Sequence, residues 1–320
     1  MEKLRHRLED NQVKIYFTSI CLGAIWGLII HGISDLEPLI NPALALMLFV
    51  TFLQVPITEI RHAFKNIRFI SALFISNFIA LPLVTAGLIQ FLPDNSFIRL
   101  AVLFVLLAPC IDYVITFTSI GKGNAKLLLA MTPILLLTQM VLLPIYIGVL
   151  LGNNVSKLIE VGPFLHAFIW FIIVPLTLAA LVQWLSNKST SFTKFTVPLN
   201  LLPVPATALV LFIVLASVTP QIRLAQNAAL QALPIYIAFA IISPVISWII
   251  ASLFKLEASS ARAISFSASY RNSLIILPLA LAVPGSMPII PAVILTQTIV
   301  ELCFLPVYLR CIPKIFPSRA

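Results

Sequence analysis

Long apolar runs separated by short polar segments recur along the whole chain. Each run has roughly the 20 residues that a helix needs to cross the hydrocarbon core of a bilayer. The pattern therefore predicts an all-α polytopic membrane protein. We place ten membrane spans at residues 15–33, 39–57, 69–92, 97–119, 125–151, 162–185, 199–219, 229–254, 259–283 and 288–311.

The sequence also repeats itself at a shift of about 162 residues. At that shift Leu143–Tyr146 aligns with Leu305–Tyr308, and both segments read Leu-Pro-(Ile or Val)-Tyr. Residues 1–159 and 160–320 then form two repeats of five predicted spans each. Because five is an odd number, the second repeat must enter the membrane from the opposite side. Inverted repeats of this kind are a recurrent design of secondary transporters, which bind their substrates where discontinuous helices meet.

Composition and charge agree with this interpretation. The chain is 60% hydrophobic and 10% charged, with a mean hydropathy of +1.08, which excludes a soluble domain. Sixteen of the twenty Lys and Arg residues fall on one side of the predicted spans, and the positive-inside rule assigns that side, with both termini, to the cytoplasm of a cell-membrane protein. The net charge of +9 thus reflects topology, and we expect a lipid bilayer and a small molecule as partners. We expect no nucleic acid and no obligate protein partner.

The fourth and ninth predicted spans contain the signs of helix breaks. Pro109 lies in the middle of the fourth span, where it removes a backbone donor and clashes with the preceding turn. The polar run Ser267–Ser273 lies in the ninth, and such a cluster is tolerated at membrane depth only where it faces protein or water. At the repeat shift, Pro109 aligns with Arg271 and Cys110 with Asn272. These matched polar positions predict a binding site.

Three charged residues lie deep within the predicted spans: Asp112, Arg271 and Glu301. Each costs roughly 2.5–3.5 kcal/mol at a helix centre on insertion scales. In one interpretation Arg271 pairs with one acid and the other acid is protonated or hydrogen-bonded. In the other, the spare acid titrates or binds a cation during transport. Gln139, which aligns with Glu301, can coordinate through its amide carbonyl.

At these residues the chain resembles the bile acid:sodium symporter superfamily. The run Ala108–Asp112 followed by Gly121–Asn124 is similar to its arsenite-efflux branch, which carries a cysteine in the fourth span. Arg271–Ser273 followed by Leu277–Ala282 is similar to the ninth span of proteins called arsenic resistance proteins. The resemblance implies a core domain of spans 3–5 and 8–10 that moves against a panel of spans 1, 2, 6 and 7. It also implies that Cys110 is a thiol ligand for arsenite or antimonite, since thiolates suit such thiophilic centres.

The chain departs from both patterns in this resemblance. Arsenite exporters carry a glutamate directly after the ninth-span asparagine, where this chain has Ser273, and the motifs of the sodium-coupled members are missing. Proton exchange would therefore need Asp112 or Glu301 in place of that acid. We expect a proton as the coupling ion, with Na⁺ left open, and no cofactor or structural metal.

Three functions follow from these observations, and we rank them. Arsenite-type efflux by alternating access comes first. Ion-coupled transport of an organic anion is the alternative, because Arg271 could bind a carboxylate or another oxyanion. An intramembrane enzyme is the remote alternative, since a protease would need a second deep aspartate beside Asp112, or a Ser–His couple, and neither is found.

Overall fold

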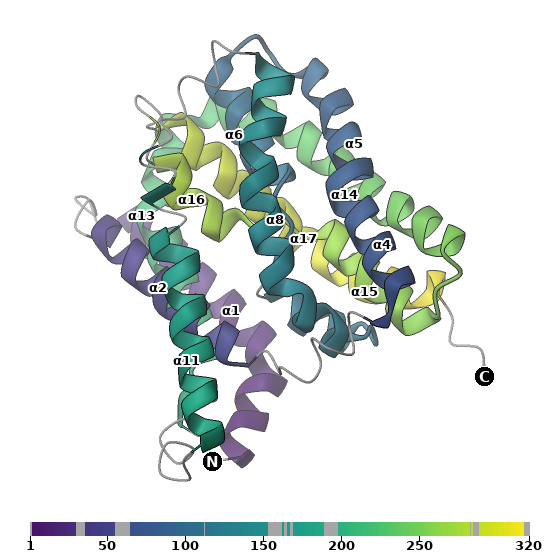
Figure 1. Ribbon diagram of the computed structural model, residues 1–320. Coiled ribbons are helices and arrows are strands. Elements are labelled where there is room, and N and C mark those ends of the chain that lie inside the picture. The colour runs from purple at the N-terminus through teal and green to yellow at the C-terminus, as the bar shows by residue number, and fades with distance from the viewer. Residues whose placement is uncertain are drawn as a thin grey trace. The chain divides into compact units, whose positions relative to one another are not determined.

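The computed structural model describes residues 2–29, 36–54, 65–111, 113–152, 162, 165–166, 169–188, 198–281, 283 and 288–316. Every extended element in this part of the chain is a helix (Figure 1). The one β-type pairing there is an isolated antiparallel bridge between Pro109 and Arg271. The all-helical fold is the one that the apolar runs predict, because a helix satisfies its own backbone hydrogen bonds in lipid.

Six helical stretches are long and apolar enough to cross a membrane, and they make the chain a multi-pass membrane protein. They are Arg7–Ile29, Ile67–Phe91, Ala125–Leu151, Pro203–Pro220, Gln226–Leu253 and Ile289–Ile315. Shorter apolar helices cover Pro38–Leu53, Ser96–Leu106 and Val174–Ser186. Among the ten predicted spans, the fourth and the ninth are each interrupted by non-helical residues, which is why neither forms one long helix.

The chain groups into two compact units, each built from two separate stretches of sequence. Unit 1 comprises Met1–Val55 and Val161–Leu224, and unit 2 comprises Pro56–Glu160 and Ala225–Ala320. Unit 1 contains helices α1 (Glu2–Ile29), α2 (Glu37–Leu53), α11 (Val174–Lys188) and α13 (Pro203–Leu224), with a π-helical turn at Ile169–Ile173.

Within unit 1, α1 lies against α13 at very short range. Gly23 and Gly27 are spaced by four residues and face the backbone of α13. A Cβ at Gly27 would lie 2.7 Å from the carbonyl oxygen of Ala216 and 3.1 Å from the Cβ of Thr219. Such small-residue pairs let two membrane helices approach closely, which is where van der Waals packing becomes their main attraction. Helix α2 lies between α13 and α11, and the amide of Gln183 donates to the two last carbonyl groups of α2.

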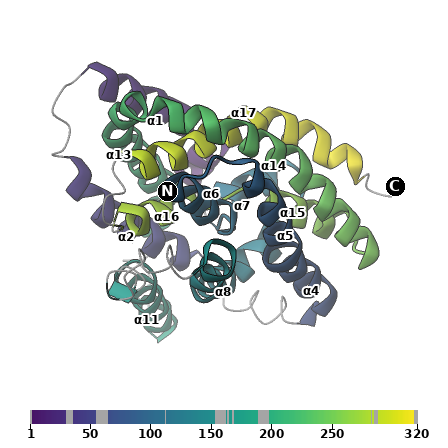
Figure 2. The same cartoon turned by 90° about the horizontal axis from the view of Figure 1, so that it is seen from above.

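Unit 2 holds the two interrupted helices and the long helices around them. The first interrupted pair is α6 (Ser96–Leu106) and α7 (Tyr113–Ile120), and the second is α15 (Ala258–Ser269) and α16 (Ser273–Leu281). Around them are α8 (Ala125–Leu151), α14 (Gln226–Leu253) and α17 (Ile289–Ile315), of which α14 and α17 pack side by side (Figure 2). The remaining stretch runs through α4 (Ile67–Ile75), a π-helical turn η2 (Ser76–Ala80), α5 (Leu81–Leu88) and a short 3₁₀ turn η3 (Ile89–Phe91).

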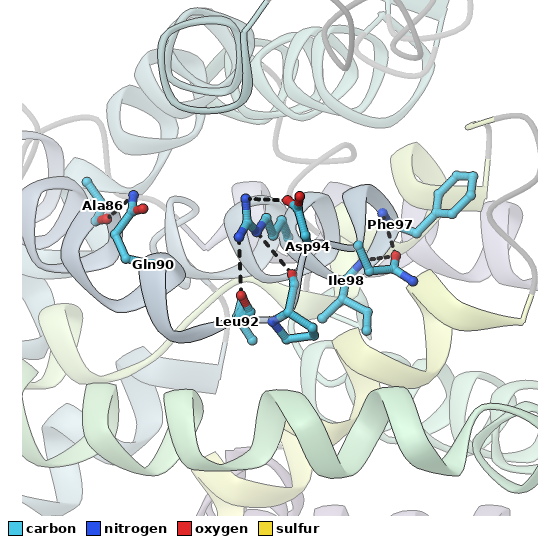
Figure 3. A network of polar contacts seen from close by, with 9 residues as sticks. Ala86, Gln90, Leu92, Asp94, Phe97 and Ile98 are labelled. Carbon is cyan, nitrogen blue, oxygen red and sulfur yellow. Dashed lines mark hydrogen bonds and ion pairs between the residues drawn. The ribbon is translucent and has the colours of Figure 1, made fainter.

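The turn before α6 shows how the sequence starts an interrupted helix. The side-chain oxygen of Asn95 accepts from the backbone N–H groups of Phe97 and Ile98, which is the usual N-cap arrangement. Arg99 bonds to the carbonyl oxygens of Leu92 and Pro93 and pairs with Asp94 at 3.0 Å (Figure 3). The Asp94 side chain is 97% exposed, so this ion pair stabilises the turn only slightly.

Candidate functional site

The two helix breaks in unit 2 are joined to each other by their backbones. The N–H of Cys110 donates to the carbonyl oxygen of Tyr270 at 3.1 Å, and the N–H of Asn272 donates to that of Ala108 at 2.8 Å. The Pro109–Arg271 bridge lies between these two bonds. A break at membrane depth leaves backbone donors and acceptors without helical partners. Here each break satisfies groups of the other, which explains how both can be buried.

This pairing is symmetric with respect to the sequence repeat. Cys110 and Asn272 donate, Ala108 and Tyr270 accept, and each of these two pairs differs by 162 residues. A second pair of contacts follows the same shift. Tyr146 donates its hydroxyl hydrogen to the carbonyl oxygen of Phe78, and Tyr308 donates to that of Ala240.

The Glu301 carboxylate lies on the N-terminal side of the second-half helices of both interrupted pairs. Its Oε2 accepts from the backbone N–H of Arg271, which precedes α16, and from Nε2 of Gln297, both at 2.7 Å. Its Oε1 accepts from the hydroxyl of Tyr113, the first residue of α7, at 2.8 Å. Glu301 is 2% exposed, and all three of its contacts are donors. Helix N-terminal ends carry a partial positive charge, so this is a favourable place for an anion.

The Arg271 guanidinium lies instead at the C-terminal ends of the first-half helices. Nη1 donates to the carbonyl oxygen of Leu106, the last residue of α6, at 3.4 Å, and Nη2 donates to that of Ala268 near the end of α15. Nη2 also donates to Oδ1 of Asn77 at 3.2 Å, and the guanidinium carbon lies 5.1 Å from the ring centroid of Phe239.

Arg271 is fully buried, and its guanidinium makes no ion pair with any residue in the described part of the chain. The interpretation in which Arg271 pairs with an acid therefore does not hold for Glu301. The physical reason is the sorting of charge by the helix ends, because the cation lies at the negative ends and the carboxylate at the positive ends. Their one direct link is the backbone N–H of Arg271.

The other predicted site residues are buried within unit 2. The Cys110 side chain is 0% exposed, and the Ser273 hydroxyl at the start of α16 accepts from Thr298 at 2.8 Å. Asn272 caps α16 by accepting from the N–H of Ile275 at 3.3 Å, while its Nδ2 has no partner among the described residues. The hydrogen bonds thus connect the backbones or side chains of four predicted residues (Cys110, Arg271, Asn272 and Glu301) around the crossing of the breaks.

Two predicted residues stand apart from this network. Gln139, on α8, is 1% exposed, and neither its amide nitrogen nor its amide oxygen bonds to a residue that the structure describes. A buried amide without partners costs free energy comparable to lost hydrogen bonds, so the position is suited to a ligand. Asp112 lies outside the described residues.

Sequence reasoning missed three contributors: Asn77, Tyr113 and Gln297. Asn77 occupies the π-helical turn η2, a local widening that is frequent at functional sites. Its Nδ2 donates to Oγ of Ser267 and to the carbonyl oxygen of Leu73, both at 3.1 Å, which aims Oδ1 at Arg271. An asparagine within an otherwise apolar run was the available signal.

Comparison with known proteins supplies the family. A model described as the Sodium Bile acid symporter family matches residues 41–225, which is more than half of the chain. The match includes Cys110 and Gln139, whereas Arg271 and Glu301 lie beyond it. A comparison with curated proteins gave no significant match. The protein, an all-helical chain with paired helix breaks, therefore belongs to the sodium bile acid symporter family.

Proposed function

We propose that this protein is a secondary transporter that exports arsenite or antimonite from the cell by alternating access. Membership of a symporter family supports secondary transport of a small molecule, and it argues against an enzyme. The observation that carries the narrower proposal is the place of Cys110. Its thiol is fully buried at the crossing of two broken helices, and broken helices are where carriers of this design bind their substrates.

A thiol at this position suits a thiophilic substrate. Thiolate is a soft ligand that prefers soft centres such as trivalent arsenic and antimony. The backbone at Cys110 is held by the bond from its N–H to Tyr270, so the thiol starts from a defined position. Because the side chain is buried, substrate would reach it only when the carrier opens to one side of the membrane.

The architecture that we propose has ten spans in two inverted repeats, 1–159 and 160–320. The contact pairs separated by 162 residues support the repeat. Unit 2 contains predicted spans 3–5 and 8–10, and unit 1 contains spans 1, 2, 6 and 7. We assign unit 2 as the core domain and unit 1 as the panel. The excess of Lys and Arg on one side supports cytoplasmic termini in the cell membrane.

The coupling ion that we propose is a proton, exchanged for arsenite through Glu301. It is the buried acid of the described network, and its carboxylate contacts the backbone of Arg271 and the hydroxyl of Tyr113. Both partners belong to the helix breaks, so protonation of Glu301 would loosen bonds that hold the crossing together. Asp112 is the other acid able to take this role. Gln139, Asn272 and Ser273 complete the proposed substrate and ion site.

Organic-anion transport is the second candidate, and buried donors without partners favour it. Nε of Arg271 and Nδ2 of Asn272 are N–H donors that bond to no described residue. A carboxylate accepts well from such donors, particularly from a guanidinium. However, the remaining guanidinium nitrogens already donate to oxygen atoms of unit 2, which leaves little of the planar fork for a second anion.

The proposal is tested by expression in an arsenite-sensitised host that lacks its own exporters. Cells that express the protein should grow at arsenite concentrations that stop the parent strain and should contain less arsenic. Equal arsenic content in expressing and parent cells would contradict arsenite export. If the same cells change their content of a labelled organic anion instead, the second candidate is correct.

A further inference from the structure

The contacts of the Arg271 guanidinium come in two pairs, and each pair is related by the repeat. Its two carbonyl partners, Leu106 and Ala268, differ by 162 residues. Its two side-chain neighbours, Asn77 and Phe239, also differ by 162 residues. A group that contacts equivalent positions of both repeats lies at or near the axis that relates them. The guanidinium therefore occupies a central position in unit 2.

That position is electrostatically a site for a cation. Leu106 ends α6, and Ala268 lies in the last turn of α15, so the C-terminal ends of both first-half helices meet there. Each helix end is equivalent to about half a negative charge. Two ends together would therefore attract about one positive charge, which is what the guanidinium supplies. The ligands it uses are two backbone carbonyl oxygens and one amide oxygen.

The same kind of ligand set serves another purpose in carriers with broken helices. There, carbonyl groups at half-helix C-terminal ends coordinate the sodium ion that couples transport. We propose that the Arg271 guanidinium is a tethered cation that fills the place of a coupling sodium ion between α6 and α15, so that this carrier works without sodium. The inference rests on the chain's being a carrier and is independent of its substrate.

The tethered cation also explains why the two repeats differ at this position. One central site accepts one cation, so only one of the two equivalent residues can supply it. Arg271 does so, and its equivalent is Pro109, which has neither a charge nor a backbone N–H. A second arginine at position 109 would bring two positive charges to the same pair of helix ends. The asymmetry at these positions is therefore required by the site.

Sodium binding without substrate is the direct test. The purified full-length protein is unfolded thermally in NaCl and in choline chloride of equal ionic strength. We expect the wild type to have the same unfolding temperature in both salts. Arg271→Ala leaves the oxygen ligands without a cation, so it should unfold at a lower temperature in choline chloride. Sodium should then raise that temperature increasingly with its concentration, as expected for a ligand of the folded state.

Two further variants keep the test decisive. Arg99→Ala removes a cation that pairs with exposed Asp94, and it should respond to the two salts as the wild type does. Arg271→Lys retains a tethered charge and should remain insensitive to sodium even if Arg271→Ala does not fold. Sodium-specific stabilisation of the wild type or of Arg271→Lys would overturn the proposal, as would a folded Arg271→Ala that ignores sodium. Because arsenite is not used, failure of arsenite export would leave this result unaffected.

Discussion

Pro109 and Arg271 face each other as an antiparallel bridge, and they are the two residues that the sequence repeat aligns. Two backbone hydrogen bonds flank the bridge symmetrically. The residues at its centre are nevertheless chemically opposite, since one is a proline and the other carries a buried positive charge. The backbone has kept the symmetry of the repeat, while the side chains have become specialised. The predictions below test that specialisation and the packing that supports it.

Replacing the buried thiol should remove arsenite transport without unfolding the protein. Cys110→Ser keeps the size of the side chain but exchanges a soft ligand for a hard one. We expect arsenite efflux to fall at least tenfold, with an unchanged unfolding temperature. Cys303→Ser is the matched control, because Cys303 is exposed and should be dispensable. Full efflux by Cys110→Ser would exclude the thiol as the arsenite ligand.

Glu301→Gln should separate substrate binding from proton coupling. An amide has the same shape, but it must turn a donor toward one of the three donors that now bond to the carboxylate. We expect the free energy of unfolding to fall by about 1–3 kcal/mol, the usual cost of an unsatisfied buried group. Transport should also stop responding to a pH gradient.

The control for this variant is Glu257→Gln, because Glu257 is exposed and bonds only to nearby serine hydroxyls. It should leave both transport and unfolding unchanged. If the Glu301→Gln carrier still follows an imposed pH gradient, a different group carries the proton.

The close packing of α1 against α13 predicts a strong effect at Gly27. In Gly27→Ala the new methyl group would meet a backbone oxygen at 2.7 Å, so one helix must move. Overpacking of this kind typically costs about 1–3 kcal/mol. Gly148→Ala in α8 is the matched control, since nothing lies within 4 Å of its added Cβ. Thermal unfolding in detergent measures both, and equal stability of the two variants would contradict the packing of unit 1.

The repeat and the helix breaks could be predicted from the sequence because both leave a local signal. Pro109 marks the first break by what it cannot do in a helix, and the polar run Ser267–Ser273 marks the second by its cost in lipid. Gln139 was found because it aligns with Glu301, and the structure buries it without a partner among the described residues.

The partners of Arg271 could not be predicted in the same way. Comparing the repeats did not single out Asn77, because its equivalent, Phe239, is apolar. The expected pairing of Arg271 with an acid ignored the charge of the helix ends, which exists only once both breaks have formed. Four half-helix ends meet at the crossing, and their positions depend on contacts between residues about 160 apart in the sequence. Such an electrostatic field belongs to the fold and cannot be read from local sequence.

The central claim is tested most directly by arsenite uptake into everted membrane vesicles without sodium. With the vesicle interior acidified, we predict that arsenite accumulates, that collapse of the pH gradient stops it, and that replacing choline chloride with NaCl changes nothing. Vesicles with Cys110→Ser should show only the uptake of vesicles that lack the protein. Wild-type uptake no greater than that background, or uptake that requires sodium, would contradict the account.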